Sequence, residues 1–275
     1  MLVVLAMTAA APALAQTGTP AERGKYLVEG ISGCGNCHTP NGPNGKVANM
    51  AFAGGLMEDN KAFRAVAANI TPDRETGIGA WTDAEIGRAI REGVSRDGRV
   101  MGPPMPFGLY RGMSDADLAA IIAYLRTVPA VRNAPGKSEY RIPLPPSYGP
   151  TVEKVPGPAR GPTAEYGAYL AGPLGHCVEC HTPMGPRGRD WNKLGQGGQP
   201  FEGPWGVAVA RNITSSKEHG LGAWTDAEIE RAVRTGVSKD GRKLFPPMGY
   251  AYYATIDAQD MKALIAFLRT IPPQE

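Results

Sequence analysis

The chain has 275 residues, of which 42% are hydrophobic and 20% charged, with 36 glycines and 26 prolines. This composition is typical of a folded protein rather than a disordered or membrane-embedded one, and the length suits two small domains. A formal net charge of +3 is too small to indicate nucleic-acid binding, so we expect no nucleic-acid partner.

Residues 1–15 have the pattern of an export signal. Leu2 to Ala11 are mostly apolar and small, and Ala13 to Ala15 form an A-x-A cleavage site before Gln16. No basic residue precedes the apolar run, so we expect the true start to lie upstream or this copy to be trimmed. A buried N-terminal helix is the alternative interpretation. No later apolar run approaches the length of a membrane span. We therefore predict a signal peptide at 1–15 and a mature protein that is soluble or peripherally bound to a membrane.

The rest of the chain is a duplication. Cys34 and Cys37 recur as Cys177 and Cys180, and the same offset carries Trp81 onto Trp224 without a gap. Most positions from 69 to 101 are identical to their partners in the second copy. The first copy begins near Ala21 and ends near Pro129, and the second spans the equivalent stretch 164–272. Such a repeat predicts two domains of one fold.

Each copy carries the same helix signals in the same order. Thr82-x-x-Glu85 is a capping box, and Gly93 stops the helix that it begins; Thr225, Glu228 and Gly236 repeat the pattern. The last helix of each copy begins near Ser114 or Asp257 and presents one apolar stripe. No convincing alternating strand pattern is present. The predicted fold class is therefore all-α.

Between the copies lies a segment dense in proline and glycine. We interpret 131–162 as a stiff, extended linker that runs over the surface, because proline fixes the backbone and the segment has no apolar periodicity. The predicted domains are then 16–130 and 163–275.

All four cysteines belong to two matching motifs, Cys34-x-x-Cys37-His38 and Cys177-x-x-Cys180-His181. A Cys-x-x-Cys-His string is the attachment signature of c-type haem. The two thiols can add to the two vinyl groups along one porphyrin edge, and the adjacent histidine becomes the proximal iron ligand. The sequence thus predicts two covalently bound haem c groups.

Other uses of paired cysteines fit less well. A thioredoxin-like redox pair needs a βαβ context, and a structural zinc site needs four ligands in one place. Disulfides suit an exported protein, but cysteines three positions apart pair poorly and the following histidine would be unexplained.

A second axial ligand is predicted downstream of each motif. Met105 and Met248 both follow a Pro-Pro pair and are separated by the same offset as the two motifs. Methionine is a known haem ligand that raises the reduction potential. Packing in the core is the alternative role. Met101 and Met113 also lie nearby, but their partners in the second copy are leucine and isoleucine, which cannot bind iron.

Some further polar residues differ between the copies, and others recur. His176 and His219 align with Gly33 and Thr76, so we expect both to be exposed or structural. The side chains of Asn69 and its partner, Asn212, are expected to bond backbone or a haem propionate rather than to carry glycans.

Each half resembles a class I cytochrome c, with an N-terminal helix, CxxCH, a mid-chain methionine and a C-terminal amphipathic helix. That resemblance implies close packing of Gly24 on Tyr124 and of Gly167 on Phe267. The N-I-T-P-D-x-E-T-G-I-G-x-W-T-D-x-E-I string, with D-G-R and P-P-M-P, is similar to the cytochrome c subunits of periplasmic alcohol, aldehyde or gluconate dehydrogenases. The best-known of those subunits carry three haem motifs, often with a C-terminal membrane anchor, whereas this sequence has two motifs and no anchor pattern.

The resemblance implies a periplasmic electron-transfer protein that takes electrons from a dehydrogenase and delivers them towards a terminal oxidase or a small cytochrome. Two irons that each hold histidine and methionine leave no open position for substrate, so no enzymatic activity of its own is expected. The alternative is a dihaem redox enzyme of the peroxidase or thiosulfate-oxidising type. A peroxidase would need an open iron with acid–base groups above it.

Overall fold

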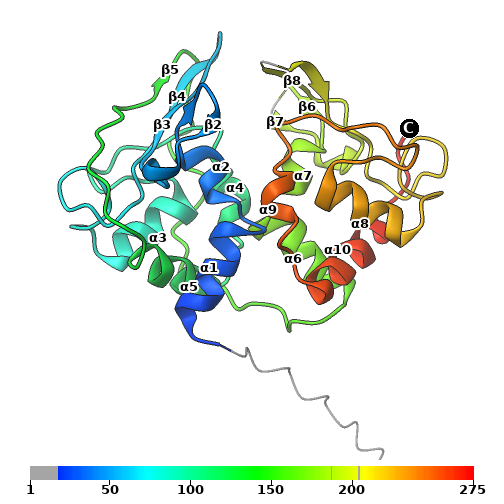
Figure 1. Cartoon of the computed structure of the whole chain (residues 1–275), viewed down its shortest axis with the longest axis horizontal. Helices are drawn as coiled ribbons and strands as arrows, with labels where there is room; N and C mark the ends of the chain where they lie inside the picture. Colours follow the sequence, from blue (N-terminus) through cyan, green and yellow to red (C-terminus); the bar gives the residue numbers. More distant parts are fainter. Residues whose placement is uncertain (1–17, 187, 204) are drawn as a thin grey trace, which may run out of the picture.

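The computed structural model describes residues 18–186, 188–203 and 205–275, and it shows two similar halves side by side (Figure 1). The predicted signal peptide at 1–15 lies outside the described residues. The first copy contains the helices α1 (Pro20–Glu29), α2 (Cys34–His38), α3 (Asp83–Glu92), α4 (Phe107–Tyr110) and α5 (Asp115–Leu125). The second contains α6 (Ala164–Tyr169), α7 (Cys177–Cys180), α8 (Asp226–Thr235), α9 (Tyr250–Tyr253) and α10 (Ala258–Thr270). Short irregular helical turns are η1 (Ala48–Met50), η2 (Leu170–Leu174) and η3 (Trp191–Lys193).

The fold is mostly helical, but the expectation of an all-α fold is wrong in detail because small antiparallel sheets are present. The first sheets are formed by β1 (Asn41–Gly42) with β2 (Gly45–Lys46), and by β3 (Gly55–Asp59), β4 (Phe63–Ala67) and β5 (Glu139–Tyr140). The others pair β6 (Met184–Gly185) with β7 (Gly188–Arg189), and β8 (Pro200–Gly203) with β9 (Gly206–Val209). These strands are very short, and a bulge near Leu56 interrupts one of them, so they show no clear period of two.

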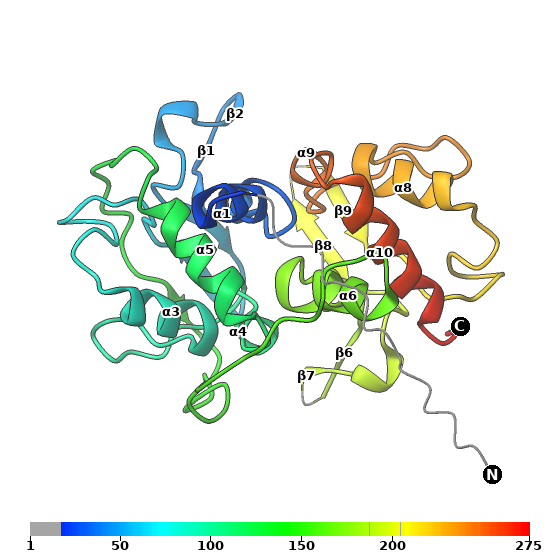
Figure 2. The ribbon, with the colours of Figure 1, turned by 90° about the horizontal axis from the view of Figure 1, so that it is seen from below.

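The first and last helices of each copy pack against each other at a glycine (Figure 2). A Cβ at Gly24 would lie only 1.9 Å from the carbonyl oxygen of Ala120 and 2.7 Å from the Cβ of Tyr124. Gly167 has the same relation to Ala263 and Phe267 in the second copy. Only a residue without a side chain allows the backbones to approach so closely. The predicted glycine–aromatic packing is confirmed, as are the two capping boxes of α3 and α8.

The two copies meet at an interface where a tyrosine hydroxyl of each copy donates a hydrogen bond to an aspartate of the other. Tyr26 of α1 donates its hydroxyl to Asp260 of α10 at 2.8 Å, and Tyr169 of α6 donates to Asp117 of α5 at 2.7 Å. Tyr26 and Tyr169 are equivalent in the repeat, as are the two aspartates. The contact is therefore reciprocal, like the interface of a two-fold symmetric dimer.

A buried ion pair strengthens one side of this interface. The guanidinium of Arg23 donates to both oxygens of Asp117, at 2.8 and 3.3 Å, and to the Tyr166 hydroxyl at 3.2 Å. Only 7% and 6% of the Arg23 and Asp117 side chains are exposed. On the other side, Arg160 of the connecting segment pairs with Asp260 and Asp257.

The connecting segment 131–162 is extended, as expected, but it is more than a spacer because it covers the first copy. Its strand β5 adds to β4, with Phe63 opposite Tyr140. Further along, Tyr148 packs on Phe107 with ring centroids 5.1 Å apart and donates its hydroxyl to the Met101 carbonyl. This segment therefore closes one side of the first copy.

Candidate haem-attachment sites

The cysteines of each motif lie on a one-turn helix that follows a left-handed residue. Gly33 precedes α2 with φ +52°, and His176 precedes α7 with φ +42°. This abrupt entry turns the chain from the first helix of each copy into the motif, so both thiols of a pair emerge from one short turn. Four free thiols are present, namely Cys34, Cys37, Cys177 and Cys180.

The imidazoles that follow the cysteines are held in the same way in both copies. The Nδ1 atom of His38 lies 2.7 Å from the carbonyl oxygen of Ala68, and Nδ1 of His181 lies 2.6 Å from that of Arg211. A carbonyl oxygen can only accept a hydrogen bond, so the ring proton lies on Nδ1. Nε2 therefore keeps its lone pair, which can bind a metal. The pKa of each ring is lowered, chiefly by withdrawal from water, and the neutral form that binds iron is favoured.

The thiols do not have the properties of a redox-active pair. Burial raises the pKa of Cys34 to about 12 and that of Cys177 to about 11. A reactive dithiol requires a lowered pKa and a positive environment. Within the part of the chain that the structure describes, no cluster of three His, Cys, Asp or Glu side chains is arranged to hold a metal ion. Two thiols with an oriented imidazole fit haem c.

Met105 and Met248 lie in equivalent loops just before α4 and α9. The peptide bond between the two prolines that precede each of them is cis. Met105 is half-buried and packs against the core, and Met248 is also half-buried. Met113 is only 1% exposed and is a core residue, like its partner Ile256. Iron ligation by Met105 and Met248 stays a prediction.

The two attachment motifs lie on either side of the interface between the copies. Figure 1 shows α2 and α4 on the side of the first copy, and α9 and α7 on the side of the second. The ring of Tyr110 from α4 meets the edge of the His176 ring, with centroids 6.0 Å apart. A Cβ at Gly35 of α2 would lie 2.9 Å from the Tyr252 hydroxyl of α9. Burial raises the pKa of the Cys180 thiol to about 12, and the neighbouring Glu179 carboxylate adds to the rise.

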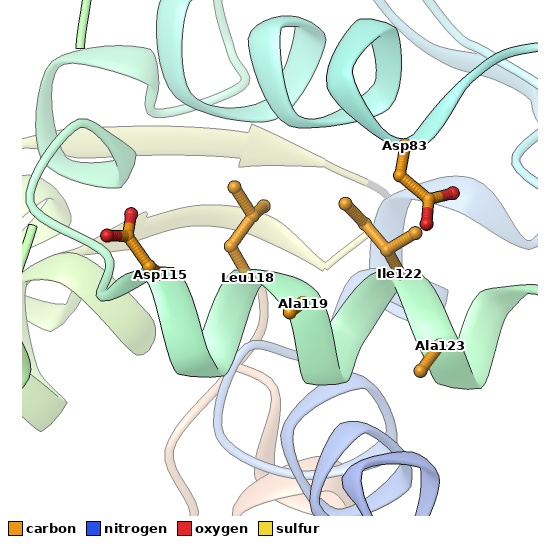
Figure 3. Close-up of a pocket in the computed structure, with 6 residues that line it drawn as sticks. All are labelled: Asp83, Asp115, Leu118, Ala119, Ile122 and Ala123. Atoms are coloured by element: carbon orange, nitrogen blue, oxygen red, sulfur yellow. The ribbon is translucent and has the colours of Figure 1, made fainter. Parts of the chain in front are cut away.

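A surface hollow of about 240 Å³ between α3 and α5 is unrelated to these motifs (Figure 3). Leu118 and Ile122 form its floor, with a carboxylate at each end. Both carboxylates are already paired, Asp83 with Arg126 at 2.8 Å and Asp115 with Arg91 at 2.7 Å. The two carboxylates of the hollow therefore form ion pairs within the protein.

The comparisons with known proteins agree with this geometry. Residues 21–129 match the cytochrome c family model. A diheme cytochrome c-type protein of Cereibacter sphaeroides is 30% identical over 256 residues, which cover 88% of this chain and 83% of that protein. The chain belongs to the cytochrome c family.

Other relatives of this cytochrome are subunits of dehydrogenases. A nicotinate dehydrogenase subunit of Pseudomonas putida is 33% identical over 91% of the chain, and the fructose dehydrogenase cytochrome subunit of Gluconobacter japonicus is 29% identical over 91%. The chain spans 21% and 52% of the length of these two relatives. With two CxxC pairs, this cytochrome has attachment sites for two haem c groups.

The remaining histidines and asparagines have structural explanations. His176 is packed against Tyr110, and His219 is about half exposed. Asn69 donates its amide to the carbonyls of Val131 and Asn133, which confirms the backbone-bonding role. The interface tyrosines were not singled out from the sequence, although the constant offset of the repeat relates them to each other.

Proposed function

We propose that this cytochrome carries electrons in the periplasm, accepting them from a dehydrogenase and delivering them to a terminal oxidase or a small cytochrome. The observation that carries the proposal is the pair of CxxCH motifs, each with an imidazole fixed through Nδ1, on the two sides of one interface. Relatives named as cytochrome subunits of fructose and alcohol dehydrogenases support the donor class. The acceptor and the location follow from the resemblance of the sequence.

The residues of each copy divide the work of holding a haem. Cys34 and Cys37 would form the two thioether bonds, His38 would bind iron through Nε2, and Met105 would offer its thioether sulfur from the opposite side; the second copy repeats this set. Bound haem supplies a reversible one-electron Fe(III)/Fe(II) couple. The protein contributes the ligand set and the water exclusion that set its potential.

The interface between the copies suits transfer of electrons from one site to the other. Tyr110 and Tyr253 are equivalent in the repeat, and Tyr110 packs against His176, the residue before Cys177. Burial raises the pKa of each phenol well above its usual value, so both remain neutral. The hydrogen bonds of Tyr169 to Asp117 and of Tyr26 to Asp260 join the two copies on the side of their first and last helices.

Within the described residues, no helix is long and apolar enough to cross a membrane.

Carbon monoxide binding separates this proposal from a dihaem enzyme of the peroxidase or thiosulfate-oxidising type. The reduced holoprotein is expected to bind negligible carbon monoxide at neutral pH, because one histidine and one methionine of each copy would both be bound to its iron. A Met105→Gly variant, which opens one position, should bind one carbon monoxide per chain. Stoichiometric binding to the unaltered protein would instead favour the enzyme.

A further inference from the structure

The two copies differ in what lies beside the outer strand of their hairpins. In the first copy β5 pairs with β4, whereas β8 and β9 form a sheet of only two strands among the described residues. The hairpins share a register near their turns, since Asp59 opposes Arg64 and Glu202 opposes Val207 at equivalent positions. The edge of β9 is therefore open where the edge of β4 is paired.

Side-chain exposure shows what the covering strand does. Val66 of β4 is 9% exposed, with Ser138 of the connecting segment bonded to its backbone N–H and C=O. Val209, its partner in the repeat, is 48% exposed. Gly102 lies under Tyr140, whose hydroxyl accepts the Gly102 N–H at 3.1 Å; its partner Phe245 is 61% exposed. An apolar surface that the first copy covers is thus open to solvent in the second.

Charges at the two ends of the covering strand also have partners in the repeat. Lys137 pairs with Asp97 at 3.3 Å, and Arg141 pairs with Asp59 at 2.9 Å. The second copy keeps an acidic side chain at both equivalent positions, Asp240 and Glu202. Asp240 already pairs with Arg242, just as Asp97 pairs with Arg99 while it also contacts Lys137. Basic groups four positions apart on an extended segment would meet both carboxylates.

We propose that this surface, the β9 strip (Glu202, Val209, Asp240 and Phe245), binds an extended segment of a partner protein that carries basic residues four positions apart. An unpaired strand edge binds such a segment through main-chain hydrogen bonds, and side-chain pockets and charges set its specificity. Phe245 lies shortly before Met248 in the chain, so the bound partner would lie beside the second haem-attachment site.

The fit at Phe245 defines one further property of the segment. A Cβ at Gly102 would lie 2.6 Å from the Tyr140 ring, so a tyrosine cannot stand in the same place over Phe245. The partner segment should therefore have a small residue at that position.

A fluorescently labelled peptide of residues 136–147 with Tyr140→Ala serves as the probe, titrated into the two-haem holoprotein at low salt by anisotropy. We expect saturable binding that Val209→Asp weakens at least about tenfold, since docking would bury an unpaired carboxylate. Glu202→Gln combined with Asp240→Asn should weaken it about three- to tenfold, the range for two exposed ion pairs.

Two control variants change similar side chains that lie outside the proposed contacts. Val207→Arg should not weaken binding, because Arg64 occupies the equivalent position and lies opposite Glu139, a residue that the peptide also contains. Asp97→Asn in the first copy should also leave it unchanged, because Lys137 already pairs with Asp97.

Amide hydrogen exchange locates the bound peptide. Exchange should slow at 206–209 and not at 63–67, whose strand is already paired. Failure of the peptide to saturate, equal affinity for Val209→Asp, or protection at 63–67 would each overturn the proposal. A concentration-dependent dimer that Val209→Asp abolishes would assign the strip to a second copy of this chain and would also overturn it. None of these outcomes bears on haem content or carbon monoxide binding, so the proposed function is tested separately.

Discussion

Removing one charge from the interface between the copies should destabilise this cytochrome strongly. In Asp117→Asn the side chain keeps its shape, but the guanidinium of Arg23 loses the carboxylate that it contacts at 2.8 Å. Both side chains are almost fully buried, and a guanidinium stays protonated inside a protein, so the variant leaves a buried cation without its anion. Breaking a buried pair in this way costs about 3–5 kcal/mol.

Urea unfolding of the holoprotein, followed by circular dichroism, measures the effect. With a slope of about 3 kcal/mol per molar, a loss of about 4 kcal/mol lowers the midpoint by about 1–2 M. Asp83→Asn is the matched control, because Asp83 contacts Arg126 at the same 2.8 Å but is 73% exposed. That variant should lose less than about 1 kcal/mol.

A double variant distinguishes loss of the pair from loss of the interface. Arg23→Met with Asp117→Leu removes both charges and should recover most of the stability, since apolar residues can replace a buried ion pair. If Asp117→Asn cost no more than Asp83→Asn, water would have to reach Arg23 and the closed interface described above would be wrong.

Four further predictions test other parts of the molecule. Cys177→Ser with Cys180→Ser should halve the haem content measured by pyridine haemochrome, and unchanged content would exclude the second attachment site. Met248→Leu should lower the reduction potential of one haem only and remove its sulfur-to-iron absorption band. A redox titration measures the potentials, and two unchanged values would contradict iron ligation by Met248. Gly24→Ala should lower the free energy of unfolding by about 3 kcal/mol, because its Cβ would lie 1.9 Å from a backbone oxygen; chemical denaturation that finds no loss would show that α1 and α5 can separate freely. Burial lowers the pKa of His176 from 6.5 to about 4, so the contribution of His176 to stability is present above pH 6.5 and is lost as the pH falls towards 4. His176→Gly introduces the residue found at this position in the first copy and should flatten that part of the plot of stability against pH. An unchanged slope would assign the pH dependence to other groups.

The sequence identified the features that depend on local spacing. The two CxxCH motifs and the capping box of Thr82 and Glu85 follow from residues close together or from one repeated offset. The need for glycine at position 24 followed from the resemblance to class I cytochromes c. The small sheets were missed because β1 and β2 are each only a dipeptide, and glycine is part of both.

The connecting segment shows a different limit of sequence reasoning. Its prolines correctly predicted an extended chain, but the pairing of Tyr140 with Phe63 joins segments far apart in the chain and leaves no periodic pattern in either. The surface that the connecting segment covers depends on where the end of the first copy lies in the folded structure. The resulting difference in exposure between Val66 and Val209, the same residue type at equivalent positions, is therefore invisible in the sequence.

The sequence alone determined that two haem-binding copies exist and which cysteine pairs serve them, because thioether attachment requires a fixed spacing along one turn. Only the tertiary structure decided how the copies meet: Tyr26 reaches Asp260 across 234 positions, and Tyr169 returns the contact to Asp117. Such contacts depend on the packed surfaces of whole helices, and the same surfaces decide that one copy is covered while the edge of β9 stays open.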